Sequence, residues 1–85
     1  KLVEVFMRLD KFLKVSRIIK RRTVANEACS GGRVQINDKV AKPGNTVKVG
    51  DIISIQFGNS LKRFEVLDLV ENAQKDQASS LYREL

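Results

Sequence analysis

The spacing of the apolar residues changes once along this chain, at Gly31-Gly32. Before that pair, Leu9, Phe12 and Leu13 fall on one arc of a helix that turns about 100° per residue. After it, apolar and polar residues alternate in short runs, as they do in half-buried strands. A chain of 85 residues buries only a small core. The sequence therefore predicts one α+β domain, in which two short helices precede a small, mainly antiparallel sheet of about four to five strands.

The first helix is expected over residues 9–16 and the second over residues 24–30. Asp10 lies near the start of the first helix, where a carboxylate interacts favourably with the helix dipole. Thr23 is expected to cap the second helix, and Gly31-Gly32 to end it in a left-handed conformation. Because the second helix is short, its stability has to come from residues that pack inward, namely Val24, Ala25, Ala28 and Cys29.

Turn residues delimit the strands. Val34 and Ile36 lead into Asn37-Asp38, a pair that tolerates the positive φ angles of a hairpin turn. Gly58-Asn59 is expected to join a strand over residues 52–57 to another over residues 63–67. The last segment, residues 73–85, has the composition of a helix that docks or of a tail that frays; its inner side would carry Ala78, Leu81 and Leu85.

The formal net charge of +6 is concentrated in residues 8–22, which hold seven basic residues and only one acid. Outside that segment, nine basic and nine acidic residues cancel. A run of charge is usually only a solvated helix face. Here, however, Arg8, Lys11, Lys14 and Arg17 step around the side opposite the apolar arc with almost no acid among them. Such self-repulsion favours a polyanionic partner.

The basic segment ends in Lys20-Arg21-Arg22, just before the second helix. Backbone N–H groups at a helix N-terminus bind phosphate, so these cations and the Thr23 hydroxyl predict a phosphate-binding corner. Arg33 and Lys39 would extend this surface across the hairpin, with Asn37 at its turn.

Several classes of chemistry are excluded or disfavoured. The chain contains no histidine, which excludes Ser-His and Cys-His catalysis and histidine-bound metals. The single Cys29 forms no internal disulfide and is expected to be a small core residue in a reducing compartment. No metal or other cofactor is expected, because Asp10, Asp38 and Asp51 form no ligand pattern. Phe12, Phe57 and Phe64 are expected to belong to the core and not to stack on bases, and Tyr82 is expected to pack or to lie at a solvated edge of the last helix.

Four motifs in order make a resemblance visible: Arg8-Leu9-Asp10-Lys11-Phe12-Leu13, Arg22-Thr23-x-Ala25, Gly32-Arg33-Val34-x-Ile36-Asn37 and Val49-Gly50-Asp51-x-Ile53. Together they resemble the small RNA-binding domain named after ribosomal protein S-four, over residues 8–57. Residues 1–7 would then be a leader or an added segment. Residues 58–85 would be a C-terminal strand plus a helix or tail of the same domain.

Because the domain stands nearly alone, the chain is most similar to the heat-shock protein fifteen / RqcP family of bacterial ribosome quality control. That resemblance implies a cytoplasmic, ribosome-associated protein of translation that binds large-subunit ribosomal RNA and peptidyl-tRNA and supports the rescue of stalled nascent chains, together with a factor that tails them. We expect a monomer with no membrane partner and no enzymatic activity. With the charge pattern, the resemblance predicts that the RNA-binding residues are Arg8, Lys11, Lys14, Arg17, Lys20, Arg21, Arg22, Thr23, Asn26, Arg33, Asn37 and Lys39.

The chain departs from the family pattern at Arg21, where Ser or Thr is usual, and at Asp38, where the hairpin usually has Gly. Residues 65–85 are net acidic, unlike the basic tail of the larger relatives, which favours the short quality-control type. Two alternatives stay open: a general module for structured ribosomal or transfer RNA, and the RNA-binding fragment of a modifying enzyme such as a pseudouridine synthase.

Overall fold

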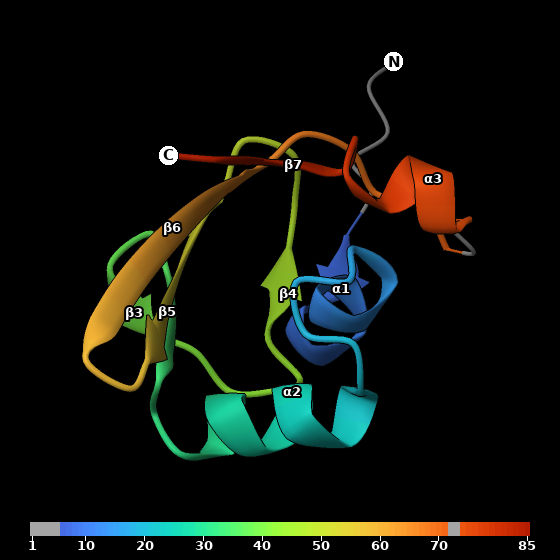
Figure 1. Ribbon diagram of the computed structural model, residues 1–85. Helices are drawn as coiled ribbons and strands as arrows, with labels where there is room; N and C mark the ends of the chain where they lie inside the picture. Colours follow the sequence, from blue (N-terminus) through green and yellow to red (C-terminus); the bar gives the residue numbers. More distant parts are fainter. Residues whose placement is uncertain (1–5, 72–73) are drawn as a thin grey trace.

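A computed structural model describes residues 6–71 and 74–85 of the chain (Figure 1). Two helices come first, α1 (Leu9–Val15) and α2 (Arg22–Ser30), and an antiparallel sheet follows them. The predicted α+β class with a small antiparallel sheet is confirmed. No helix among the described residues is long and apolar enough to cross a membrane.

The main sheet has five strands in the order β3-β2-β5-β6-β7, and every neighbouring pair is antiparallel. Its strands are β2 (Val34–Ile36), β3 (Lys39–Val40), β5 (Ile52–Phe57), β6 (Ser60–Val66) and β7 (Tyr82–Glu84). A separate ladder pairs β1 (Met7–Arg8) with β4 (Thr46–Val47) beside the start of α1. One further short helix, α3 (Lys75–Ala78), precedes β7.

The β2–β3 hairpin turns as its sequence predicts. Asn37 and Asp38 both adopt positive φ, at 51° and 69°, which are the angles that let a two-residue turn match the twist of its strands. The Asn37 side chain also ties this turn to β5. Its Nδ2 donates to Asp51 Oδ1 at 3.1 Å, and its Oδ1 accepts from the backbone N–H of Ile52 at 3.0 Å.

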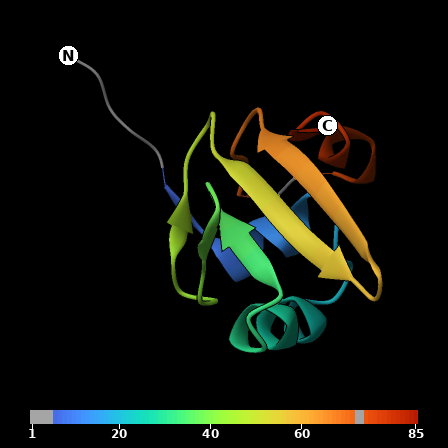
Figure 2. The same ribbon diagram turned by 90° about the vertical axis from the view of Figure 1, so that its left-hand side faces the viewer.

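The core lies between the two helices and one face of the sheet. In Figure 2 the sheet lies in front of α1, and α2 runs along its lower end. The predicted apolar arc of α1 is confirmed, because Leu9, Phe12 and Leu13 are all fully buried. Alternation along β5 and β6 directs a second set toward these residues, namely Ile53, Ile55, Phe64 and Val66.

The start of α2 differs from the prediction. The helix begins at Arg22, with Arg21 as its N-cap and no side-chain capping bond, so the prediction that Thr23 caps it is wrong. Val24, expected to pack inward, is 45% exposed. Ala25, Ala28 and Cys29 are buried as predicted. Their contact with the rest of the core fixes the rotation of α2, and this packing outweighs the roughly 1 kcal/mol that a capping hydroxyl contributes.

The C-terminal segment contains a short helix and, after it, a strand that the sequence did not predict. The helical part is only the four residues of α3, and the chain then pairs with β6 as β7. Ala78 and Leu81 are buried, but Leu85, expected on the same inner side, is exposed. The physical reason is that β6 would otherwise present unpaired backbone groups at the sheet edge, which β7 satisfies. Most of the segment expected to be a leader, residues 1–7, lies outside the described residues, but its last residue, Met7, belongs to β1.

The aromatic residues differ in how deeply they are buried. Phe12 and Phe64 are buried as predicted, and Tyr82 is half-buried with its ring edge-to-face on Phe64 at 5.4 Å between centroids. The prediction that Phe57 belongs to the core is wrong, because its side chain is 40% exposed. It is the last residue of β5, where the sheet extends beyond the packed interior.

Replacing Leu13 tests the packing of α1 on the sheet. Because Leu13 is fully buried, we expect Leu13→Ala to lower the free energy of unfolding by about 2–5 kcal/mol. Urea denaturation followed by circular dichroism measures this change. Val40→Ala, at an exposed position on β3, is the control and should change stability by less than about 0.5 kcal/mol. Equal losses in the two variants would contradict the assignment.

Candidate nucleic-acid interface

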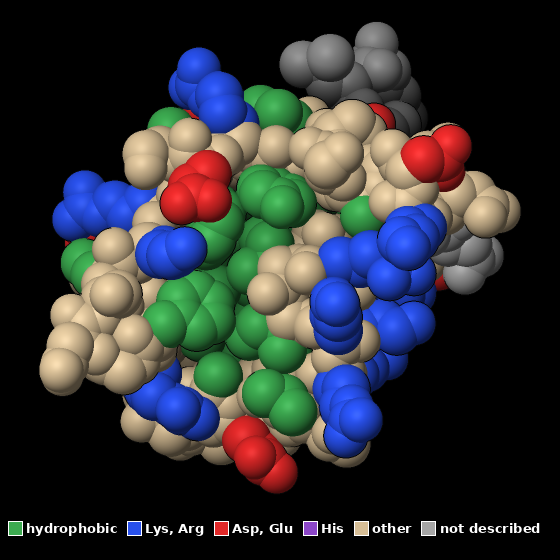
Figure 3. Space-filling model, viewed as in Figure 1, with side chains coloured by type: hydrophobic (Ala, Val, Ile, Leu, Met, Phe, Trp, Pro, Cys, Tyr) green, Lys and Arg blue, Asp and Glu red, His purple; other side chains and the backbone are tan. Residues whose placement is uncertain are grey.

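One side of the molecule carries most of the predicted RNA-binding residues. We call it the basic surface: Arg8 beside α1, Lys11 and Lys14 on α1, Arg17, Lys20 and Arg21 in the loop, and Arg22, Thr23 and Asn26 on α2. All of these except Lys11 are exposed. Figure 3 shows the Lys and Arg side chains gathered over α1 and the following loop, at the right of the view. The two packed helices thus hold a cationic patch on a rigid base.

A buried carboxylate organises this surface. Asp10 is only 2% exposed, and Arg8 approaches it with a two-pronged contact, with Nε and Nη2 each 3.2 Å from a carboxylate oxygen. From α2, Arg22 Nη2 and Asn26 Nδ2 each lie 3.5 Å from Asp10 oxygens. The backbone N–H of Lys11 donates to Asp10 at 2.8 Å. One acid therefore links the strand before α1, the first turn of α1 and the first half of α2.

The ionisation of Asp10 follows from these contacts. Burial by itself would raise the pKa of this carboxyl group. The hydrogen bond from Arg8, the positive charges of Arg22 and Arg8, and the amide of Asn26 outweigh burial, so the pKa lies below its ordinary value of 3.8. Asp10 is accordingly ionised at neutral pH and holds the two arginines at fixed positions.

The N-terminus of α2 opens onto solvent beside this cluster. Because the side chain of the N-cap residue, Arg21, makes no capping bond, the first N–H groups of the helix are available to an anion. A shallow hollow of about 370 Å³ lies here, lined by Asp10, Arg22, Thr23, Asn26 and Glu27. The two carboxylates on its wall mean that a phosphate has to approach from the outer side, where the Arg22 side chain is 48% exposed.

Arg17 has an unusual backbone. It follows the end of α1 with φ of 62°, a left-handed conformation that favours glycine. Its N–H donates to the Lys14 carbonyl at 3.1 Å, which helps to close the helix end. A large cation at such a position stores roughly 1–2 kcal/mol of strain, and strain of this kind is concentrated at functional sites.

Three predicted residues lie away from the basic surface. Arg33 follows α2, and Asn37 and Lys39 belong to the β2–β3 hairpin, at the left of Figure 1 and apart from α1. The Asn37 amide is already engaged in two internal hydrogen bonds. On α1, Lys11 Nζ forms an ion pair with Glu71 at 2.9 Å, so one acid of the C-terminal region lies against this cation.

The thiol of Cys29 and the possible metal ligands are the other groups that could carry chemistry. Cys29 is fully buried, as predicted for a core residue. Burial, aided by the negative charge of Asp10, raises the pKa of its thiol to about 11. Within residues 6–71 and 74–85, no cluster of three or more potential ligands is able to hold a metal ion.

Sequence reasoning missed two features of this region. It placed Asp10 at a helix start without seeing that α2 would bring Arg22 and Asn26 to the same carboxylate. It also assigned Phe57 to the core and gave no role to Lys62, yet both line a hollow beside Arg17 that is separate from the one at the start of α2. The three-residue spacing of Arg8, Lys11 and Lys14 carried no signal for either feature, because both depend on tertiary packing.

Replacing Asp10 tests its role as the link between the helices. In the folded chain its pKa is depressed, so the ionised form stabilises the fold above about pH 4, and that contribution is lost as the pH falls through the folded-state pKa. We expect Asp10→Asn to lower the free energy of unfolding by about 1–3 kcal/mol at pH 7. The difference in the free energy of unfolding between Asp10→Asn and the unmodified chain should decrease as the pH falls. Chemical denaturation from pH 7 to pH 2 measures it.

Asp38→Asn is the matched control, because Asp38 is an exposed acid in the hairpin turn. It should leave stability nearly unchanged across the same pH range. A pH-independent difference between Asp10→Asn and the unmodified chain would contradict the proposed ionic link.

Comparisons with known proteins show the family to which the chain belongs. Residues 7–53 match the family model described as S4 domain. An RQC P-site tRNA stabilizing factor of Halalkalibacterium halodurans is 54% identical over 89% of this chain and 86% of its own length. The protein of the same name from Bacillus subtilis is 47% identical, over 89% of this chain and 88% of its own.

A solved structure extends the match to the whole fold. Heat Shock Protein 15 of Vibrio cholerae, described as trimeric, superposes with a TM-score of 0.84 at 33% identity, over 98% of this chain and 83% of the other. The match includes the C-terminal residues that the S4 model does not cover. The chain belongs to the S4 domain family, and within it to the family of the RQC P-site tRNA stabilizing factors and heat shock protein 15.

Proposed function

We propose that this chain binds transfer RNA and ribosomal RNA on the large ribosomal subunit, and that it supports ribosome-associated quality control by stabilising the P-site tRNA of stalled complexes. The observation that carries the proposal is the 54% identity with a protein named RQC P-site tRNA stabilizing factor, which extends over most of both chains. The basic surface provides a physical basis for it.

The chemistry of the basic surface suits structured RNA. Folded RNA is recognised largely through its shape and its phosphate groups, so cations held at fixed positions on a rigid helix pair are appropriate. Arg8 and Arg22 are oriented by Asp10, which leaves part of each guanidinium free to contact phosphate in a planar, two-pronged way. Lys14, Lys20 and Arg21 add positive charge around them.

We further propose a cytoplasmic protein that acts as a monomer on subunits carrying peptidyl-tRNA and assists a factor that extends the stalled nascent chain. The dense positive charge of residues 8–22 opposes the association of two copies through this face. In this role the chain acts by binding and catalyses no reaction.

A second candidate is a general module for structured RNA. It is favoured by the nature of the basic surface, whose groups address phosphate and thus carry no sequence information. The two functions differ in whether large subunits with peptidyl-tRNA are bound in preference to free tRNA or bare ribosomal RNA.

The salt dependence of RNA binding tests the electrostatic basis of both functions. If about six phosphates are neutralised, the logarithm of the association constant should fall with the logarithm of salt concentration with a slope of roughly −4 to −5. A fluorescence titration with purified tRNA and with large subunits measures this slope between about 50 and 200 mM salt. A flat response would show that the basic surface does not bind RNA through its charge.

Arg22→Ala tests the surface at its centre. We expect it to reduce cosedimentation with large subunits that carry peptidyl-tRNA, while the free energy of unfolding changes by less than about 1 kcal/mol, because the side chain is half exposed and 3.5 Å from Asp10. Arg63→Ala, on the face of β6 that points away from the helices, is the matched control and should bind normally.

Equal binding by Arg22→Ala and Arg63→Ala would contradict the placement of the interface. Preferential binding of the unmodified chain to free tRNA over loaded large subunits would favour the general module instead.

A further inference from the structure

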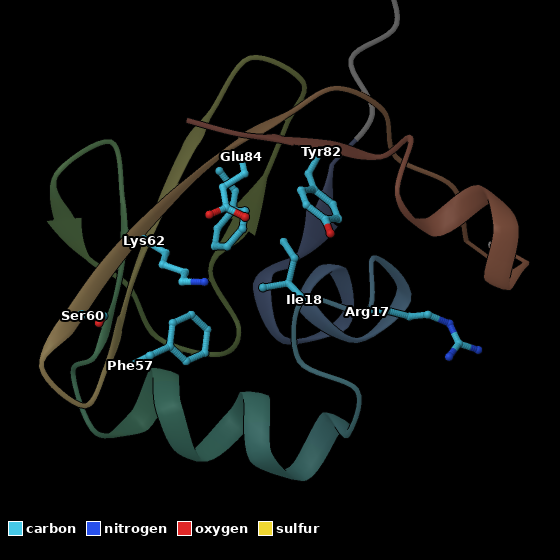
Figure 4. Close-up of a pocket in the computed structure, with 8 residues that line it drawn as sticks. Arg17, Ile18, Phe57, Ser60, Lys62, Tyr82 and Glu84 are labelled. Atoms are coloured by element: carbon cyan, nitrogen blue, oxygen red, sulfur yellow. The ribbon is translucent and has the colours of Figure 1, made fainter.

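A hollow of about 370 Å³ lies between the loop after α1 and the β5–β6 hairpin. In Figure 4, Ile18, Phe57, Lys62 and Tyr82 point toward this space, whereas the guanidinium of Arg17 projects away from it toward solvent. Ser60, Phe64 and Glu84 complete its wall. The lining therefore combines an apolar floor, aromatic rings, hydroxyl groups, the carboxylate of Glu84 and two cations, of which only Lys62 points inward.

A second hollow of about 320 Å³ continues from the first, since Ile18 and Phe57 line both. Arg33 lies on the wall of the second hollow. We call the two together the apolar groove, and Figure 3 shows it as a band of hydrophobic side chains across the face, with Lys and Arg on both sides. The groove thus connects Arg17 of the basic surface with Arg33, a predicted RNA-binding residue that lies apart from that surface.

The exposure of this apolar lining is unfavourable in the free protein. Phe57 is 40% exposed and Val24, on the wall of the second hollow, is 45% exposed. A continuous apolar patch with a polar rim on a small domain is typical of a binding site, because the same residues would be more stable covered.

Resting on the proposed function, we propose that the apolar groove binds an unpaired nucleotide of the RNA that the basic surface contacts. The base would stack on the half-exposed ring of Phe57 against Ile18, and Lys62 would contact the adjoining phosphate. The Glu84 carboxylate and the Tyr82 and Ser60 hydroxyls would meet the polar edge of the base, where Glu84 accepts from an exocyclic amine.

Continuity with the basic surface favours RNA over a protein segment. Arg17 and Ile18 are consecutive, and the left-handed backbone of Arg17 sends its guanidinium outward while Ile18 faces the groove. A strand held at Arg17 therefore lies next to the groove without a gap. An acidic amphipathic peptide would satisfy the cations equally well, but it would leave the ring of Phe57 and the polar wall at Ser60 and Glu84 without a matching planar ligand.

The test is a titration of the full chain, labelled for NMR, with the cytidine hexanucleotide r(C)6. We expect the signals of Ile18, Phe57 and Tyr82 to shift. Phe57→Ala should weaken the affinity measured at Ile18 and Tyr82 by at least about fivefold, because an aromatic ring contributes that much to holding a stacked base. Leu61→Ala is the matched control: Leu61 lies on the same hairpin but on the opposite face of the sheet, and its loss should change nothing.

Phe57→Leu keeps the apolar volume and removes the aromatic face, so it tests stacking even if Phe57→Ala does not fold. Inorganic phosphate and a synthetic amphipathic peptide of Leu and Glu are parallel probes. Unshifted groove signals with r(C)6, equal affinities for Phe57→Leu and the unmodified chain, or equal shifts with phosphate alone would overturn the proposal. So would shifts produced by the peptide and not by r(C)6.

These outcomes are separable from those of the proposed function. If the groove does not bind r(C)6 but binding to loaded large subunits still depends on Arg22 and on salt, only the nucleotide site is overturned. If Arg22→Ala and salt have no effect on subunit binding, the proposed function itself fails.

Discussion

The carboxylate of Asp10 is the contact on which the arrangement of the basic surface depends. Residues 8–22 bring seven cations together, and their mutual repulsion opposes the packing of α1 on α2. Asp10 offsets this repulsion from inside, because it is buried and attracts Arg8 from before α1 and Arg22 from α2. Without Asp10 the positive charges of Arg8 and Arg22 would lose their shared counter-charge, so this link both stabilises the helix pair and orients its guanidinium groups.

The residues that follow α1 connect the basic surface to the neighbouring apolar groove. The left-handed backbone at Arg17 separates two side chains that are adjacent in sequence, with Arg17 directed to solvent and Ile18 toward the sheet. A glycine would adopt the same backbone without strain, but it would provide no cation. The strain at this position is therefore compatible with a requirement for charge where the basic surface meets the apolar groove.

The parts of this fold that follow local rules were predictable from the sequence. The arc of Leu9, Phe12 and Leu13 specifies a helix, and Asn37-Asp38 specifies a hairpin because those residues tolerate positive φ. The parts that depend on distant partners were not. β7 pairs with the free edge of β6, and Phe57 is exposed because the sheet extends beyond the helices. The spacing of neighbouring residues in the sequence predicts neither feature.

The same division between local and distant contacts bears on specificity. Phosphate contacts position a protein on RNA without identifying the site, whereas contacts to unstacked bases identify it. The basic surface comes from one continuous segment that includes Arg17 and Arg22, so charge pattern alone reveals it. The apolar groove combines Ile18 with Phe57 and Lys62, which only the folded sheet brings close. A chain with both the basic surface and the apolar groove would distinguish among folded RNAs of equal charge. It would select those in which an unpaired nucleotide lies beside the RNA helix that the cations bind.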